Sequence, residues 1–150
     1  SRLICGGGEI WVRSPYLFER YIGDGSAVWD QGWLSVGEMG RLEAGYLYLS
    51  GRAGRMVTVA DQNVFPEEME AVMADFPGII QVAVLPEQDA LRGVVMVAVL
   101  QGDMAQEAQI LARSRSVFGV LKAPRRLIWR QDWPLLPSGK TDLRALQTWL

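Results

Sequence analysis

Residues 51–70 read Gly-Arg-Ala-Gly-Arg-Met-Val-Thr-Val-Ala-Asp-Gln-Asn-Val-Phe-Pro-Glu-Glu-Met-Glu, and the chain changes its architecture within them. Gly51 and Gly54 bracket a short joint, because glycine populates backbone conformations that other residues avoid. The apolar run at residues 56–59 predicts a short strand. Pro66 followed by two glutamates is typical of a helix start, where acidic side chains complement the helix dipole. We therefore expect a joint, then a strand, then a helix.

The residues before this joint are patterned as strands. Residues 9–13 alternate between apolar and polar side chains, and residues 33–36 and 46–49 are short apolar or aromatic runs. Residues 37–40 and 44–45 contain the glycines expected of turns. The N-terminal part is therefore predicted to be all-β, with a hairpin leading to the joint.

Strands and helices alternate after the joint. Apolar residues at helical spacing predict a helix from about 66 to 76. A β-branched run predicts a strand at 79–85, an apolar run predicts a central strand at 93–100 after a turn at 86–92, and a third strand is expected at 126–130. A second helix is expected at 106–121, with Val117 and Leu121 among its inward residues. The predicted fold class is α+β: a short β-rich N-terminal segment followed by a small domain of α/β-sandwich type.

Composition excludes several functional classes. The hydrophobic fraction of 49% is that of an ordinary globular protein, and a net charge of −2 offers no basic surface for a nucleic acid. No histidine is present, and the single cysteine, Cys5, excludes an intrachain disulfide and a cysteine-cluster metal site. We expect no metal site. The longest apolar run, 93–100, is too short to span a bilayer, and no signal peptide is visible, so a soluble cytoplasmic protein is the default.

A lysine stands in a tight loop near the C-terminus. The loop reads Leu136-Pro137-Ser138-Gly139-Lys140-Thr141 and precedes an amphipathic tail, residues 142–150. Proline fixes its own φ and glycine permits a positive one, so the loop is expected to be exposed. A long ammonium side chain there suits a carboxylate or phosphate oxygen. Alternatively, the lysine only adds solubility.

Three segments together resemble the later core motifs of the adenylate-forming superfamily. They are residues 8–15 with 32–38, residues 51–70, and residues 136–141, and the resemblance covers about residues 8–147. The superfamily contains acyl-CoA synthetases, peptide-synthetase adenylation domains and luciferases. Its members form an acyl adenylate from ATP and a carboxylic acid, release pyrophosphate, and then transfer the acyl group to the thiol of CoA or of a carrier-protein pantetheine.

The resemblance implies a domain organisation and a nucleotide site. Residues 1–53 would be the last β subdomain of a large adenylating domain, and residues 54–150 its mobile C-terminal lid. Lys140 matches the catalytic lysine that enters the active site for adenylation. Arg52 matches a ribose-binding arginine, and Glu38 stands where an aspartate usually accepts from the ribose hydroxyls. The alternatives are an ion pair at the joint for Arg52 and an exposed turn for Glu38.

The resemblance also implies a hinge and a thiol channel. Gly54 falls at the hinge, where the family usually carries aspartate or lysine. Ala60 and Asp61 replace a glycine pair whose missing side chains let the backbone line the pantetheine channel of CoA ligases. An aspartate there would narrow the channel or repel CoA. An acyl carrier protein is therefore an alternative acceptor, even though residues 63–70 look like the acyl-CoA synthetase form of the segment.

These expectations combine into a function. The chain is predicted to be the C-terminal portion of an ATP-dependent carboxylic acid:thiol ligase of the acyl-CoA synthetase type, as in fatty acid metabolism. ATP with Mg would be bound mainly by a missing N-terminal adenylating domain, so the isolated chain is expected to be inactive. Its start at Ser1 in the middle of a pattern indicates a piece of a longer protein. The alternative is a noncatalytic interaction module with the same fold.

Two surface features remain open. Arg125 and Arg126 would form a basic patch for a phosphate or a carrier protein, or else only a solvated strand end. A β subdomain separated from its parent would expose apolar edges, so self-association is also expected.

Overall fold

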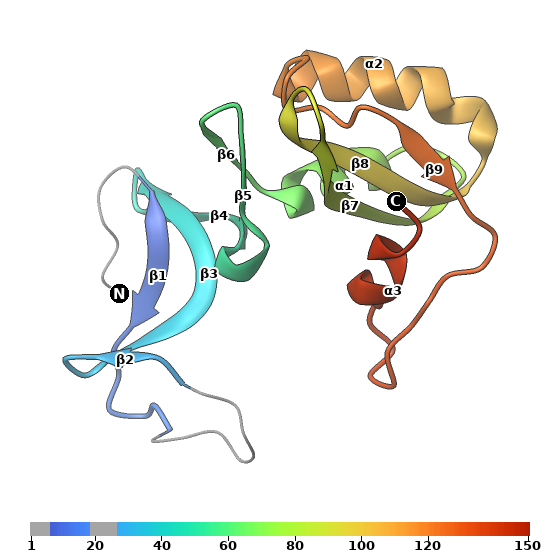
Figure 1. Cartoon of the computed structure of the whole chain (residues 1–150). Helices are drawn as coiled ribbons and strands as arrows, with labels where there is room; N and C mark the ends of the chain where they lie inside the picture. Colours follow the sequence, from blue (N-terminus) through green and yellow to red (C-terminus); the bar gives the residue numbers. More distant parts are fainter. Residues whose placement is uncertain (1–6, 19–26) are drawn as a thin grey trace. The chain divides into compact units, whose positions relative to one another are not determined.

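The computed structural model describes residues 7–18 and 27–150 (Figure 1). The elements of its first half are β1 (Gly8–Val12), β2 (Trp29–Asp30), β3 (Trp33–Glu43), β4 (Tyr46–Arg52), the 3-10 turn η1 (Ala53–Arg55), β5 (Val57–Val59), β6 (Gln62–Val64) and α1 (Pro66–Ala74). Those of its second half are β7 (Ile79–Asp89), β8 (Gly93–Gly102), the 3-10 turn η2 (Met104–Gln106), α2 (Glu107–Phe118), β9 (Leu127–Trp129) and α3 (Leu143–Gln147). The mixed, strand-rich content confirms the α+β class. Cys5 lies outside the described residues.

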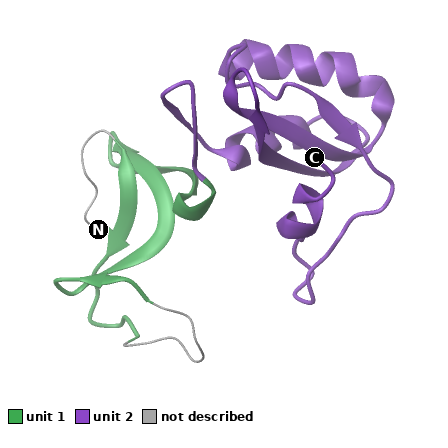
Figure 2. Cartoon of the chain, in the orientation of Figure 1, with its two compact units in different colours: residues 1–55 green, residues 56–150 purple. Residues whose placement is uncertain are grey.

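The chain divides into two compact units, residues 1–55 and residues 56–150 (Figure 2). The first unit holds an antiparallel sheet, in which β3 pairs with β1, β2 and β4. Ile10 and Leu34 are its buried apolar residues among those described. The expected turn at residues 37–40 is wrong, because β3 runs through it as one strand. These residues stay within the strand, and the register of its pairing with β4 shifts between Met39 and Gly40.

The second unit is built on a sheet of order β7-β8-β9, with β7 antiparallel and β9 parallel to the central β8. Alternate residues of a strand face opposite sides, so β8 supplies two cores. One core joins Met96, Ala98 and Leu100 to residues of α1 and α2. The other joins Val99 to Leu146 of α3 and to the tail residues around it. The sheet is therefore covered on both faces.

Two elements of the second unit have other bounds than the sequence predicted, and one strand was not predicted. β7 continues past Pro86 to Asp89, so the predicted turn shrinks to residues 90–92. β6, which was not predicted, completes a hairpin with β5. α2 ends at Phe118, and Val117 and Leu121 are 45% and 70% exposed instead of inward-facing. Within the described ranges, no helix has the length and apolarity needed to cross a membrane.

Candidate active site

Lys140 lies at the end of a closed, exposed hairpin between β9 and α3. The N–H of Leu136 donates to the carbonyl of Lys140 at 2.7 Å, and the N–H of Gly139 donates to the carbonyl of Leu136 at 2.8 Å. Gly139 has a φ of 81°, a left-handed conformation that glycine adopts without strain. The predicted tight, exposed loop is therefore confirmed, and the segment projects from the sheet in Figure 1.

The base of this loop is tied to the domain on both sides. The indole Nε1–H of Trp133 donates to Oγ1 of Thr141 at 3.0 Å. Asp142 accepts at Oδ1 from the N–H groups of Arg144 and Ala145, each at 3.0 Å, and so caps the start of α3. The backbone that carries Lys140 is thus anchored at its base, while the lysine itself is exposed.

Arg52 and Glu38 lie side by side in the first unit. They are opposite one another in the register of β4 and β3, and Arg52 Nε lies 3.5 Å from Glu38 Oε1. Their side chains are 63% and 32% exposed. The structure thus brings the two predicted ribose contacts together, and it also contains the ion pair that was the alternative for Arg52. Glu38 is half-buried within β3, so the alternative of an exposed turn is wrong for it. The guanidinium and the carboxylate together offer donors and acceptors to a diol.

Gly54 lies within the short 3-10 turn η1, next to the boundary between the two units. A Cβ atom added to it would meet no atom within 4 Å, and its φ is outside the left-handed region. The position therefore has room for a side chain, such as the aspartate or lysine that the family resemblance led us to expect there.

Ala60 and Asp61 form the two-residue turn between β5 and β6. Both have positive φ values, 48° and 60°. Turns with two left-handed central residues favour glycine or asparagine, since a Cβ atom is strained there. The glycine pair expected from the family resemblance therefore has a conformational reason as well as a steric one.

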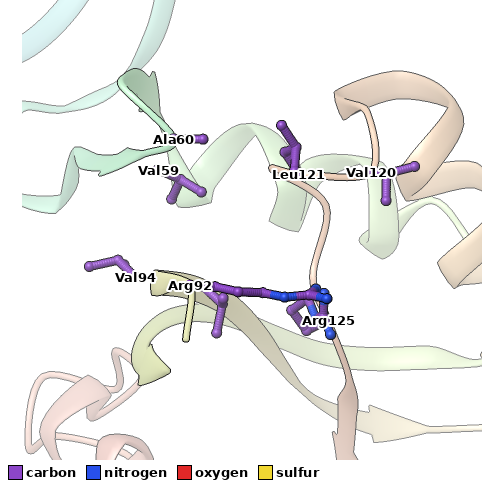
Figure 3. Close-up of a pocket in the computed structure, with 8 residues that line it drawn as sticks. Val59, Ala60, Arg92, Val94, Val120, Leu121 and Arg125 are labelled. Carbon is purple, nitrogen blue, oxygen red and sulfur yellow. The ribbon is translucent and has the colours of Figure 1, made fainter. Parts of the chain in front are cut away.

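A pocket of about 520 Å³ opens beside this turn (Figure 3). Ala60 belongs to its lining, and Asp61 is an exposed neighbour that does not line it. The other lining residues are Val59, Arg92, Val94, Val95, Val120, Leu121 and Arg125. The side chains of Arg92 and Arg125 converge in Figure 3 on an otherwise apolar lining. Two guanidinium groups on apolar walls suit a ligand that carries both an anionic and an apolar part.

The predicted patch of Arg125 and Arg126 is divided in the structure. Arg125 lines the pocket, whereas Arg126 donates to Glu87 at 2.7 Å and to the carbonyl of Leu150 at 3.2 Å. Sequence reasoning missed Arg92, because a single arginine in a turn carries no motif. Only the fold brings the turn after β7 to the segment before β9.

No group of three or more histidine, cysteine, aspartate or glutamate residues in the described part of the chain could hold a metal ion. Lys140 and the pocket belong to the second unit, whereas Arg52, Glu38 and Gly54 belong to the first.

Comparison with known proteins identifies the fold. Residues 68–140 match the model of the AMP-binding enzyme C-terminal domain. The chain is 33% identical over 144 residues to the uncharacterized acyl-CoA ligase YhfT of Bacillus subtilis, covering 95% of this chain and 29% of that protein. It is 30% identical over 141 residues to the long-chain-fatty-acid–CoA ligase FadD13 of Mycobacterium tuberculosis, covering 90% of this chain and 28% of that protein.

Solved structures of adenylate-forming enzymes have the same fold as this chain. The amide bond synthetase McbA of Marinactinospora thermotolerans superposes with a TM-score of 0.83 at 29% identity, over 99% of this chain and 32% of that one. The o-succinylbenzoate CoA synthetase of Bacillus subtilis, in complex with its acyl-adenylate intermediate, superposes with a TM-score of 0.83 at 25% identity, over 94% of this chain and 30% of that one. The chain thus spans less than a third of each relative. Residues 68–140 belong to the AMP-binding enzyme C-terminal domain family, and the chain corresponds to the C-terminal part of adenylate-forming enzymes.

Proposed function

We propose that this chain is the C-terminal portion of an ATP-dependent carboxylic acid:CoA ligase, with Lys140 as the lysine of the adenylation step. The exposed Lys140 loop, on a domain of this family, is the observation that carries the proposal. Leu135 and Leu136, beside it, are also exposed, at 57% and 42%. Exposed apolar residues around a lone cation fit a loop that packs against another domain during the reaction.

The first step is proposed to be acyl-adenylate formation. A carboxylate oxygen bonds to the α-phosphorus of ATP, while the bond to the pyrophosphate oxygen breaks. Lys140 would contact the carboxylate and the α-phosphate and stabilise the charge that develops between them. ATP and its Mg are proposed to bind mainly outside these residues, in an N-terminal adenylating domain.

Arg52 and Glu38 are proposed to hold the ribose of the nucleotide. Their pairing at 3.5 Å supports this role, because each orients the other in the absence of a hydroxyl pair. Glu38 reaches one methylene further than the usual aspartate. Arg52, which lies opposite it on β4, compensates for this extra length by fixing the direction of the carboxylate.

CoA is proposed as the thiol acceptor of the second step. The pocket beside Ala60 supports CoA over a carrier protein, since Arg92 and Arg125 suit the phosphates of a free cofactor. The repulsion expected from Asp61 is weakened because Ala60, not Asp61, lines this pocket. An acyl carrier protein remains the second candidate acceptor. The likeness to an amide bond synthetase makes an amine worth including in the same assay.

Gly54 is proposed as the hinge about which residues 54–150 move as a lid on the subdomain formed by residues 1–53. Its place beside the boundary between the two units supports this role. The isolated chain is proposed to be inactive, because it spans less than a third of its relatives. The relatives named above are ligases and synthetases and do not support the noncatalytic alternative. The cytoplasmic location and self-association stay predictions.

The test is ATP–pyrophosphate exchange by the enzyme that carries this chain, against fatty acids, indoleacetate and 2-succinylbenzoate. These acids are taken from the names of its relatives. Exchange with one class would establish the ligase and its substrate, whereas a folded protein that exchanges with none would refute the proposal. The acceptor is then tested with CoA and phosphopantetheinylated carrier protein. Arg92→Ala and Arg125→Ala should raise the KM for CoA without changing exchange.

A further inference from the structure

A side-chain hydrogen bond anchors the Lys140 loop at the residue next to the lysine. The indole Nε1–H of Trp133 donates to Oγ1 of Thr141 at 3.0 Å. Both residues are half-buried, whereas residues 135–140 are exposed. The bond therefore lies where the loop leaves the core of the second unit.

The donor of this bond is itself held in place. Trp133 packs against the buried cluster of Ala83, Leu85, Val99 and Leu146, which joins the sheet to α3. On the other side of Thr141, the side chain of Asp142 caps α3. Thr141 is thus fixed between the sheet, through Trp133, and the helix, through its neighbour.

The backbone hydrogen bonds of the loop do not give it this direction. They join Leu136 to Lys140, Gly139 to Leu136, and Asp142 to Pro134, so they fix the shape of the hairpin but act only within it. A hairpin of fixed shape can still pivot about its base. The link from Thr141 to the core limits that pivot one residue from Lys140.

We propose that Trp133 and Thr141 are positioning residues that aim Lys140 at the reacting phosphate, and that they control the rate of adenylation through that lysine. This inference rests on the proposed function of Lys140. Small displacements of a charged group in a transition state cost much of its effect, so a loosened hairpin lowers kcat while substrate binding persists.

The central variant is Thr141→Val, which keeps the shape of the side chain but removes the acceptor. In the enzyme that carries this chain, we expect kcat for ATP–pyrophosphate exchange to fall roughly five- to fifty-fold. The KM values for acid and ATP should stay within about twofold, because Lys140 acts on the transition state. Trp133→Phe, which removes the donor, should have the same effect. Thr141→Ser, which keeps a hydroxyl, should restore most of the rate.

Two readouts separate positioning from a general loss of structure. Thiol transfer from preformed acyl adenylate does not use Lys140 in the proposed scheme, so Thr141→Val should leave it unchanged. In a Lys140→Ala background, Thr141→Val should lower exchange no further, since its effect passes through the lysine.

Matched controls remove comparable hydrogen bonds away from the loop. Trp129→Phe removes the hydrogen bond that the indole N–H donates to Glu107 at 2.8 Å in the same unit. Thr148→Val removes the hydrogen bond that the hydroxyl donates to the carbonyl of Ala145. Both should leave exchange within about twofold of wild type, although they alter stability.

The outcomes distinguish the positioning role of Trp133 and Thr141 from the proposed function of Lys140. If Lys140→Ala abolishes exchange but Thr141→Val and Trp133→Phe do not slow it, the positioning role is overturned and the proposed function stands. The positioning role is also overturned if Thr141→Val lowers exchange by the same factor in the wild-type and Lys140→Ala backgrounds. It is overturned as well if Thr141→Val slows thiol transfer as much as it slows exchange. If Lys140→Ala leaves exchange intact, both are overturned.

Discussion

At the scale of single residues, the backbone of the turn at Ala60 and Asp61 is strained, because both residues have positive φ values. Ala60→Gly should raise the free energy of unfolding by about 0.5–1 kcal/mol, since left-handed alanine costs roughly 1–2 kcal/mol and the extra freedom of glycine when unfolded offsets part of that gain. Chemical denaturation measures the change. Ala90→Gly is the matched control: this exposed turn alanine has no positive φ, so glycine should destabilise it. Destabilisation by both variants would contradict the strain.

The pair of Arg52 and Glu38 is expected to act on the nucleotide more than on stability. Glu38→Gln should raise the KM for ATP by about tenfold, the value of one hydrogen bond to a charged group. Because Arg52 is exposed and Glu38 is only half-buried, stability should change by less than about 1 kcal/mol. Steady-state kinetics of the enzyme that carries the chain test this.

The control for this pair lies on the same strand. Glu43 pairs with Arg41 at 3.3 Å, and both side chains are more than half exposed. Glu43→Gln should leave the KM for ATP unchanged. An equal effect of the two variants on the KM would show a general electrostatic influence in place of a ribose contact.

The sequence predicted elements where local preference and tertiary packing agree. The helix that begins at Pro66 and the apolar strand that begins at Gly93 appear as expected, since proline and acidic residues start helices and an unbroken apolar run suits a central strand. Pro86 misled the reading of β7, because β7 is an edge strand in a sheet of order β7-β8-β9, where a missing N–H is tolerated. Val117 is exposed because α2 turns that side away from the core.

The site was predictable only in part, for a similar reason. Lys140 was found because its Pro-Ser-Gly context is local in sequence. Two features were not found, since tertiary structure alone creates them: the hydrogen bond between Trp133 and Thr141, and the shared pocket that Arg92 and Arg125 line. The roles assigned to the predicted site residues all stay predictions: Lys140, Arg52, Glu38, Gly54, Ala60 and Asp61.

At the element scale, the place where the start of β7 lies against the end of β8 should be intolerant of side chains. A Cβ atom added to Gly102 would lie 2.2 Å from the carbonyl oxygen of Gly78, and Gly102 has a φ of 145°. Gly102→Ala should therefore lower the free energy of unfolding by about 3 kcal/mol, since backbone must move. Gly54→Ala, where no atom lies within 4 Å, is the control and should change it by less than about 1 kcal/mol. Comparable losses from the two variants would contradict the close backbone approach of Gly102 to Gly78.

At the scale of the whole molecule, the nucleotide contacts and the catalytic lysine are proposed to lie on different units. Lid rotation about Gly54 would let one polypeptide serve two half-reactions in turn. The isolated chain should therefore bind no triphosphate productively and show no ATP–pyrophosphate exchange. Measurable exchange by residues 1–150 alone would contradict the assignment of the remaining active site to an N-terminal domain.

Lys140→Ala in the enzyme that carries this chain tests the central claim most directly. Lys122 and Lys140 are the only lysines of the chain, so Lys122→Ala is a matched control that removes the other ammonium group. ATP–pyrophosphate exchange with the cognate acid should fall by about two or more orders of magnitude in Lys140→Ala, with the fold intact, and should persist in Lys122→Ala. Equal exchange by both folded variants would contradict the adenylation role of Lys140.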